Sequence, residues 1–448
     1  MEALKITFIF FLHILLFNSL PFALNTVSSK RPEAEALVRW KNALSPHDSL
    51  DSWDLNNVRN LCSWTGVVCS TEGLISEINL SGANLSGTLD QLDLTLFSNL
   101  TNLNLSHNDF HGLIPSTIGN LSKLTFLDLS YNMLSGIIPP EIGILTELEY
   151  ISSYNNSLSG QIPYQISDLQ DLRYLDFGSN YLTSPEWSKF KSFPVLTYLS
   201  FSFNSLTLGF PDFILSCQNL TYLDFSFNFF IGEIPNSSFT HLDKLEYLNL
   251  TGNSFQGTLQ SIFTKLTKLK GIELGGNNFS CLIPDIFGLM PNLEFLGVTS
   301  FQGNIPSSLG KLRNLQHLYL EINSPLNFTI PSEIGLCTNL TYLVLAGNSL
   351  MGSLPLSFTN LTKISILAII DSNLSGHISP YFFTNWTQLT RLFIEGNSFT
   401  GEIPSEIGLL TNLNLLVLSG NRFSGYIPQV IGSLRNLSIL DLSVNLFS

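Results

Sequence analysis

Charged residues are scarce in this sequence. Only 12% of its 448 residues are Asp, Glu, Lys or Arg, and the acidic residues exceed the basic ones to give a formal net charge of −14. A chain of this charge repels phosphate backbones and anionic lipid surfaces, which argues against a nucleic-acid partner. The acidic balance suits a cationic partner, and it serves equally well as a solubilising surface.

Long apolar runs are missing beyond the N-terminal segment. Residues 1–24 carry Lys5, an apolar stretch from Ile6 to Phe17 and the small residue Ala23, which is the layout of a secretory signal peptide. The stretch is too short to span a bilayer comfortably, so a signal anchor is the second interpretation. We expect a protein of the secretory pathway, attached to a membrane only through a segment absent from this chain.

The most informative feature is an internal repeat of 24 or 25 residues. The pattern Leu124-x-x-Leu127-x-Leu129-x-x-Asn132-x-Leu134-x-Gly136-x-Ile138-Pro139 recurs in a constant register. Its asparagine marks each repeat and stands at Asn108, Asn132, Asn156, Asn180, Asn204, Asn228, Asn253, Asn277, Asn323, Asn348, Asn397, Asn421 and Asn445. The pattern predicts a solenoid of about sixteen repeats over residues 74–448, the last of which breaks off at Ser448.

Each part of the repeat has a predicted structural role. The segment Leu127-Asp128-Leu129 alternates apolar and polar side chains, which predicts a short strand with its leucines inward and a parallel sheet of stacked strands. The asparagine amide can both donate and accept, so it can satisfy backbone groups that the turn after the strand leaves unpaired. Gly136 and Ile138-Pro139 predict an outer side that is extended rather than helical.

Cysteine and histidine are too few and too scattered for a metal site, because no spacing among them approaches ligand geometry. Cys62 and Cys69 flank a six-residue segment that a disulfide would close in an oxidising compartment. Cys217, Cys281 and Cys337 lie in separate repeats, too far apart to bridge, and are predicted as free packing thiols. No nucleophile has a paired base, so we expect no catalytic site, no metal and no cofactor.

A known family shares these motifs. The sequence L-x-G-x-I-P recurs at Gly136–Pro139, Gly160–Pro163, Gly232–Pro235, Gly401–Pro404 and Gly425–Pro428. It resembles the plant-specific class of leucine-rich repeat. Residues 31–70, with an amphipathic helix carrying Leu37, Trp40 and Leu44 and then the paired cysteines, resemble the N-terminal cap of plant leucine-rich-repeat receptor-like kinases. The resemblance implies a β-dominated α/β solenoid, a right-handed leucine-rich-repeat superhelix with a parallel concave sheet and an N-terminal disulfide cap.

Members of this family carry an extracellular solenoid, a transmembrane helix and a cytoplasmic serine/threonine kinase. No H-R-D motif stands in this chain, and its D-F-G, at Asp176-Phe177-Gly178, is part of a repeat; the chain looks incomplete at Ser448. Relatives that capture a peptide's free carboxylate use two arginines alternating on one strand, whereas the nearest match here, Arg391-Leu392-Phe393, supplies one. No long insertion interrupts the array, so the island domain of steroid-sensing relatives is not expected.

Aromatic and acidic residues recur at the strand positions that face outward. An aromatic side chain stands six residues before the asparagine of the repeat, or one or two residues before it. These residues are Phe126, Tyr131, Tyr150, Tyr154, Tyr174, Tyr198, Phe203, Tyr222, Phe227 and Tyr247. A carboxylate stands four residues before the asparagine at Asp128, Asp176, Asp224 and Glu273. Aromatics provide rigid contact area and carboxylates favour Lys or Arg on a partner, so these residues predict a peptide groove. Ordinary pairing of side chains on a strand surface is the competing interpretation.

Sequons for N-glycosylation are abundant, in part because the repeat itself spells N-L-S or N-L-T. The predicted sites are Asn84, Asn99, Asn120, Asn155, Asn219, Asn236, Asn278, Asn327, Asn339, Asn360, Asn373, Asn385 and Asn436. Two further sequons, Asn104 and Asn249, lie on the predicted concave strands, where a glycan would block part of the groove.

Two functions follow from this resemblance. The first is the extracellular recognition module of a plant receptor-like kinase or receptor-like protein, binding a peptide ligand or the leucine-rich-repeat ectodomain of a co-receptor in growth or immune signalling. It would lie on the extracellular side of the plasma membrane or in the apoplast. The alternative is a soluble secreted leucine-rich-repeat protein that binds or inhibits a microbial cell-wall-degrading enzyme. An enzyme is a distant third possibility.

Overall fold

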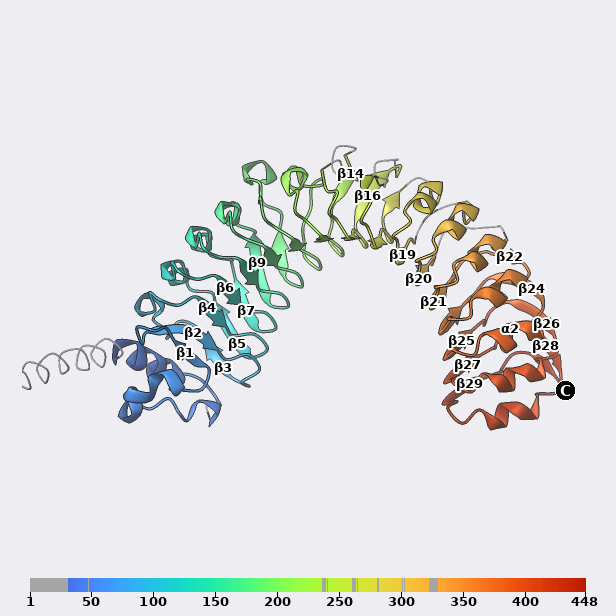
Figure 1. The fold of residues 1–448 in the computed structure, drawn as a ribbon, viewed down its shortest axis with the longest axis horizontal. Coiled ribbons are helices and arrows are strands. Elements are labelled where there is room, and N and C mark those ends of the chain that lie inside the picture. Colours follow the sequence, from blue (N-terminus) through green and yellow to red (C-terminus); the bar gives the residue numbers. More distant parts are fainter. Residues whose placement is uncertain are drawn as a thin grey trace, which may run out of the picture. The chain divides into compact units, whose positions relative to one another are not determined.

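The computed structural model describes residues 31–46, 48–235, 239, 241–259, 263, 265–279, 282–299, 301, 303–321 and 329–448. The predicted signal peptide lies outside these ranges. The chain divides into two compact units, Met1–Ser205 and Leu206–Ser448, each built of stacked repeats (Figure 1). Among the described residues, no helix has the length and apolar character that a membrane span requires.

The first unit begins with a cap that is held by aromatic packing and one disulfide. Its elements are a helix over residues 31–41, η1 (Asp48–Leu50), η2 (Leu55–Ser63) and β1 (Val67–Cys69), which pairs antiparallel with β2 (Ile75–Asn79). Cys62 and Cys69 form the predicted disulfide. The rings of Trp40, Trp53 and Trp64 pack in series with centroids 6.2 and 6.3 Å apart, and Trp40 also stacks on Phe110 of the repeats. The cap therefore covers the first apolar end of the solenoid.

The repeats of the first unit each contribute one strand to a parallel sheet, as the leucine pattern predicts. After β2 these strands are β4 (Asn102–Asn104), β6 (Phe126–Asp128), β8 (Tyr150–Ser152), β10 (Tyr174–Asp176) and β12 (Tyr198–Ser200). The register places equivalent residues opposite each other, so Phe126 pairs with Tyr150 and Tyr150 with Tyr174. This register turns the sequence period into columns of like side chains across the sheet.

A second parallel sheet and a series of short helices complete each turn of the first unit. The sheet contains β3 (Ser86–Thr88), β5 (Asp109–Leu113), β7 (Met133–Gly136), β9 (Ser157–Gln161) and β11 (Tyr181–Thr183). The 3-10 helices are η3 (Leu94–Leu96), η4 (Ser116–Asn120), η5 (Pro140–Ile144), η6 (Tyr164–Asp168) and η7 (Trp187–Lys189). The expectation of a purely extended outer side is wrong, because the proline stands at or just before the first helical position, where its missing N–H is not needed.

The second unit repeats this plan. Its main parallel strands are β13 (Tyr222–Asp224), β15 (Tyr247–Asn249), β17 (Gly271–Glu273), β19 (Phe295–Gly297), β20 (His317–Tyr319), β21 (Tyr342–Val344), β23 (Ile366–Ala368), β25 (Arg391–Phe393), β27 (Leu415–Val417) and β29 (Ile439–Asp441). In Figure 1, β25, β27 and β29 lie side by side along one edge of this unit, and α2, β26 and β28 lie toward the opposite edge.

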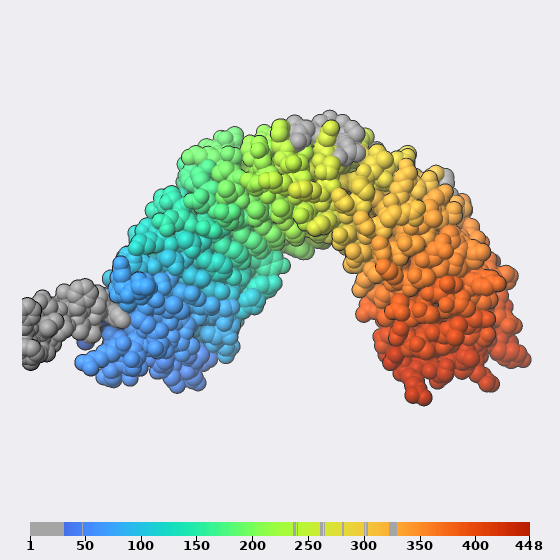
Figure 2. All heavy atoms as spheres, viewed as in Figure 1, coloured from blue at the N-terminus to red at the C-terminus, as the bar shows by residue number. Residues whose placement is uncertain are grey.

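The other side of the second unit also carries strands and short helices. Its strands are β14 (Ile231–Glu233), β16 (Ser254–Gly257) and β18 (Asn278–Phe279), then β22 (Met351–Gly352), β24 (Asn373–His377), β26 (Ser398–Gly401), β28 (Arg422–Gly425) and β30 (Leu446–Phe447). Its helices are η8 (Asp212–Ser216), η10 (Asp285–Leu289), η11 (Ser307–Lys311), η12 (Ser332–Leu336), η13 (Leu356–Asn360), the α-helix α2 (Pro380–Asn385), η14 (Ser405–Leu409) and η15 (Gln429–Ser433). Figure 2 shows the repeats of each unit packed against their neighbours into a continuous surface.

Buried leucines and an asparagine ladder hold successive repeats together, as the sequence predicts. Leu127 and Leu129 are fully buried. Asn156 accepts a hydrogen bond from the backbone N–H of Leu134 at 2.9 Å and donates to the carbonyl of Leu129 at 2.9 Å, both in the preceding repeat. Where Ser372 replaces the asparagine, its hydroxyl donates to the carbonyl of Asn348 at 2.7 Å. The ladder thus loses contacts at that repeat.

A glycine in several of the 3-10 helices allows these helices to stack closely. A Cβ on Gly143, Gly310 or Gly335 would lie 2.4 Å from a carbonyl oxygen of the next repeat, that of Gln165, Glu333 or Ser357 respectively. No real Cβ approaches backbone oxygen so closely, so the outer packing depends on the absence of a side chain there.

The predicted free cysteines are confirmed where the structure describes them. Cys217 and Cys337 are buried and form no disulfide, and burial raises the pKa of the Cys337 thiol to about 11. Cys281 lies outside the described residues.

Candidate functional site

The first unit presents a column of stacked aromatic rings on its main sheet. The ring centroids of Phe126, Tyr150, Tyr174 and Tyr198 lie 4.3, 4.3 and 4.1 Å apart, with 11° between successive planes. Because each ring face covers the next, a partner would meet ring edges and hydroxyl groups rather than open faces. The structure therefore brings these predicted residues together as a stack of rings, and not as separate rings that each offer a face to a partner.

Two tyrosine hydroxyls of this column, those of Tyr150 and Tyr174, remain protonated. Burial, followed by the nearby Asp128 carboxylate, raises the pKa of Tyr150 to about 12. Burial and Asp176 also raise the pKa of Tyr174. These two residues thus present neutral hydroxyl groups, each of which can donate a hydrogen bond.

Three of the predicted carboxylates have a structural function that sequence reasoning missed. One oxygen of Asp128, Asp176 and Asp224 accepts the backbone N–H two residues later, at 2.9, 2.9 and 2.8 Å. Asn249 makes the equivalent bond to Thr251 at 3.0 Å. These side chains close the turn after the strand, so a partner has less of each carboxylate to bind.

Aromatic residues just before the asparagine lie in strained backbone. Tyr131, Phe203 and Phe227 have φ of 52°, 51° and 51° and are 43%, 50% and 47% exposed. Left-handed backbone costs a non-glycine residue roughly 1–2 kcal/mol. Tyr154 lies beside Tyr131, with ring centroids 5.3 Å apart. The left-handed backbone recurs just before the asparagine of other repeats, as at His107 and Asn155, so it is a property of the turn after each strand.

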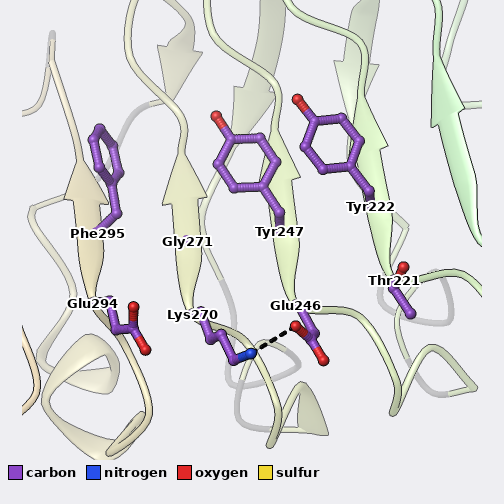
Figure 3. A pocket seen from close by; sticks show the side chains of 8 residues that line it. All are labelled: Thr221, Tyr222, Glu246, Tyr247, Lys270, Gly271, Glu294 and Phe295. Atoms are coloured by element: carbon purple, nitrogen blue, oxygen red, sulfur yellow. Dashed lines mark hydrogen bonds and ion pairs between the residues drawn. The ribbon is translucent and has the colours of Figure 1, made fainter.

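In the second unit, the aromatic column is interrupted by a glycine, and a hollow opens there. Tyr222 and Tyr247 stack at 4.7 Å, but the next residue in register is Gly271, followed by Phe295. Figure 3 shows the space above Gly271 between the rings of Tyr247 and Phe295. The hollow has a volume of about 430 Å³ and is lined by Thr221, Tyr222, Glu246, Tyr247, Lys270, Gly271, Glu294 and Phe295. We call it the apolar hollow, because three rings form its walls.

Gly271 is required by the position of Tyr247. A Cβ at residue 271 would lie 2.5 Å from Cδ2 of the Tyr247 ring. The Tyr247 hydroxyl donates a hydrogen bond to the carboxylate of Glu273, two residues beyond the glycine. The ring therefore leans across the glycine toward a carboxylate on the next strand.

One ion pair lies at the rim of the apolar hollow. Lys270 Nζ lies 2.8 Å from the Glu246 carboxylate, and both side chains are about half exposed (52% and 43%). Glu246 raises the pKa of Lys270, so the ammonium stays charged. The pair leaves little free positive charge at this rim.

A second hollow of about 280 Å³ adjoins the first and is acidic. It is lined by Thr251, Glu273, Gly275, Phe295, Gly297, Thr299, Tyr319 and Glu321. We call it the acidic hollow, since its described lining contains two carboxylates and no basic side chain. Phe295 lines both hollows and packs against Tyr319 with centroids 5.3 Å apart.

Burial dominates the electrostatics of the acidic hollow. It raises the pKa of Glu273, although the hydrogen bond from Tyr247 opposes that rise. Asp224, which does not line this hollow, adds to the rise through its charge. Among the described residues, no group of His, Cys, Asp and Glu has the arrangement of a metal site.

Sequence reasoning found Tyr222, Tyr247 and Glu273 but missed Phe295, Tyr319 and Glu321. Phe295 and Tyr319 occupy outward strand positions in later repeats, and Glu321 follows strand β20. Counting positions from the asparagine of each later repeat could have found them. The hollow itself depends on Gly271, and nothing in the sequence marks that glycine as a gap between two rings.

The sequons differ in exposure. Asn249 is 8% exposed and its side chain caps the strand, so this site is unsuited to a glycan on the groove. The exposed sequons are Asn84, Asn120, Asn155, Asn278, Asn360, Asn373 and Asn436. The half-buried ones are Asn99, Asn104, Asn219, Asn339 and Asn385. Asn236 and Asn327 lie outside the described residues.

Family models match several parts of the chain. The leucine rich repeat N-terminal domain matches residues 31–70, and leucine rich repeat models match residues 98–158, 194–255, 339–361, 388–410 and 412–434.

Curated relatives are plant receptor kinases. The leucine-rich repeat receptor-like serine/threonine-protein kinase RGI4 of Arabidopsis thaliana is 35% identical over 117 residues, which are 26% of this chain and 11% of that protein. MDIS1-interacting receptor like kinase 2 of the same plant is 38% identical over 101 residues, 22% of this chain and 10% of that protein. The matched segments thus span about a tenth of these relatives.

The solved structures similar to this chain include plant receptor ectodomains. The TDR receptor aligns with a TM-score of 0.72 and 30% identity, over 82% of this chain and 64% of that one. The Arabidopsis receptor kinase HAESA, solved with the peptide hormone IDA and the co-receptor SERK1, aligns with a TM-score of 0.62 and 27% identity, over 93% and 82% of the chains. These likenesses cover both compact units.

Proposed function

The chain belongs to the leucine-rich-repeat proteins that carry the leucine-rich-repeat N-terminal domain, and we propose that it is the extracellular ligand-binding module of a plant receptor-like kinase. Its ligand would be a peptide that lies along the main sheet of the second unit. The observation that carries this proposal is the pair of aromatic-walled hollows on either side of Phe295.

The comparisons support this function by analogy. HAESA was solved with a peptide hormone and a co-receptor, and PEPR1 was solved with AtPEP1. A solenoid surface recognises an extended ligand by contacting it from many repeats at once. We infer that the chain works on the extracellular side of the plasma membrane or in the apoplast, together with a co-receptor ectodomain and with a kinase that is not in these residues.

The proposal can be tested by peptide capture. The chain would be secreted from insect cells, immobilised and exposed to the peptide fraction of a plant extract, and retained peptides would be identified, synthesised and measured for affinity. We expect the double variant Tyr247→Ala and Phe295→Ala to lose the retained peptides. Tyr181→Ala is the matched control, because this tyrosine is 65% exposed on the second sheet of the first unit.

Two outcomes would contradict the proposal. Equal retention by the wild type and the double variant would place binding elsewhere. Capture of an intact microbial cell-wall-degrading enzyme in preference to any peptide would support the soluble inhibitor instead.

A further inference from the structure

The two hollows differ in chemistry although they share a wall. The apolar hollow is walled by the rings of Tyr222, Tyr247 and Phe295. In its lining Lys270 is paired with Glu246, and Glu294 accepts a hydrogen bond from the Gln316 amide. The acidic hollow holds Glu273 and Glu321 beside the ring of Tyr319, and the described residues that line it include no basic side chain. One hollow suits an uncharged side chain, and the other suits a cation.

We propose that the ligand of this surface is an extended peptide with an apolar side chain and an Arg or Lys side chain two residues apart. The apolar side chain fills the apolar hollow, the basic side chain fills the acidic hollow, and Phe295 stands between them. The inference rests on the function proposed above and specifies the chemistry of its ligand.

The spacing follows from the geometry of an extended chain. Side chains of residues i and i+2 point to the same face of a strand and lie roughly 6.6 Å apart. Neighbouring residues point to opposite faces, so they cannot enter two hollows on one surface. Because Phe295 lines both hollows, the two side chains need only reach around a single ring.

The acidic hollow offers a cation both charge and ring faces. Tyr247 donates its hydroxyl to Glu273, which orients that carboxylate at the boundary of the two hollows. Glu321 lies in the same lining, and Phe295 and Tyr319 stack beside it. A guanidinium can pair with a carboxylate in two bonds while it stacks on an aromatic ring, so Arg should bind better than Lys.

A library of synthetic peptides tests this inference. Acetylated and amidated octapeptides with a constant Gly-Ser background would carry Leu-x-Arg, Leu-x-Gln, Ala-x-Arg or the adjacent pair Leu-Arg, and their affinities would be measured by fluorescence anisotropy. A further set with both positions randomised shows whether the chain binds peptides of any other kind. We expect Leu-x-Arg to bind about tenfold more tightly than each of the three comparison peptides.

Variants of the chain assign the discrimination to the acidic hollow. In Glu273→Gln and Glu321→Gln, we expect the preference for Arg over Gln to fall to about twofold, because a neutral amide keeps the shape and loses the charge. Glu395→Gln is the matched control, since this half-buried carboxylate follows strand β25, away from both hollows. It should leave the preference unchanged.

The outcomes separate this inference from the proposed function. If Leu-x-Gln or the adjacent pair binds as tightly as Leu-x-Arg, or if the variants keep the full preference, the proposed ligand chemistry is wrong. Binding of other peptides that is lost in the Tyr247→Ala and Phe295→Ala double variant would then leave the receptor function intact. If no peptide of either set binds, both proposals fail.

Discussion

Single asparagines carry much of the connection between repeats. Asn421 accepts from the backbone N–H of Phe399 at 3.0 Å and donates to the carbonyl of Ile394 at 2.8 Å, and it is 7% exposed. Substitution by Ala would leave buried backbone groups without partners, each costing roughly 1–3 kcal/mol. We expect Asn421→Ala to lower the free energy of unfolding of the second unit by about 2–4 kcal/mol, measured by denaturant titration.

Ser372 is the natural control for that substitution, because it occupies the asparagine position of an earlier repeat in the same unit. Its hydroxyl makes one short bond, to the carbonyl of Asn348. We expect Ser372→Ala to cost about 1 kcal/mol. Equal losses in the two variants would show that the asparagine amide has no special part in the ladder.

Glu273 is expected to make stability depend on pH. Burial raises its pKa above the ordinary value of 4.5, so the folded state holds this proton more tightly than the unfolded chain does. As pH rises from 4.5 through the raised pKa, the free energy of unfolding should therefore decrease, and it should stay lower above that window. Glu273→Gln cannot titrate and still accepts a bond from Tyr247.

Denaturant titrations of Glu273→Gln and of the wild type over a series of pH values check this sign. The variant should match the wild type at low pH and exceed it in stability at neutral pH. Asp224, whose pKa is also raised, is present in both proteins, and its repulsion is one cause of the raised pKa of Glu273. A stability difference that does not change with pH would mean that the Glu273 carboxyl does not titrate as its burial implies.

Residue roles differ in how far the sequence predicts them. The ladder asparagines and inward leucines were predicted, because a repeat can bury them only against its neighbours. The hydrogen bond from the N–H of Ser130 to the Asp128 carboxylate was not predicted, because an Asp at this position can equally well point into solvent from the strand surface. Its position alone does not distinguish a ligand contact from a turn cap.

Among the elements, the short outer helices depend on glycine for their spacing. A Cβ on Gly335 of η12 would lie 2.4 Å from the carbonyl oxygen of Ser357 in η13. Backbone cannot move aside as a flexible side chain can, so we expect Gly335→Ala to destabilise the second unit by about 1–3 kcal/mol in denaturant titration.

The matched control lies in another helix of the same unit. At Gly432 of η15, no heavy atom lies within 4 Å of the position that a Cβ would occupy, so a methyl group there meets open space. We expect Gly432→Ala to stay within about 1 kcal/mol of the wild type, with a gain from the better helix propensity of Ala. Similar losses in both variants would show that the loss does not come from stacking against the next repeat.

The elements were predicted less evenly than the residues. Period-two alternation and the leucine spacing predicted the main strands, because those signals are local. The Ile-Pro pair was interpreted as preventing any helix, yet η5 begins at Pro140, directly after Pro139. Proline stops a helix only from within, and at the first turn its fixed φ favours one.

At the scale of the whole molecule, the candidate site arises from register across repeats. Gly271 is an ordinary strand residue by itself, and it becomes the floor of a hollow only because Tyr247 and Phe295 occupy the same column on either side. A single repeat therefore contains no signal for the site. The stacking of several repeats creates it, which explains why the predicted groove residues only partly coincide with the lining.

The net charge of the whole chain should control how fast a basic ligand arrives. At a formal charge of −14 the field of the protein attracts a cation over a distance set by salt, with a Debye length of roughly 30 Å at 0.01 M and 8 Å at 0.15 M. We expect the association rate constant of the Leu-x-Arg peptide to fall severalfold between these ionic strengths, in stopped-flow anisotropy. The dissociation rate should change much less, because short-range contacts in the hollows set it.

The uncharged Leu-x-Gln peptide should associate at a rate independent of salt. If both peptides respond alike to salt, the acidic surface serves solubility alone, and selection of a basic ligand takes place only after contact.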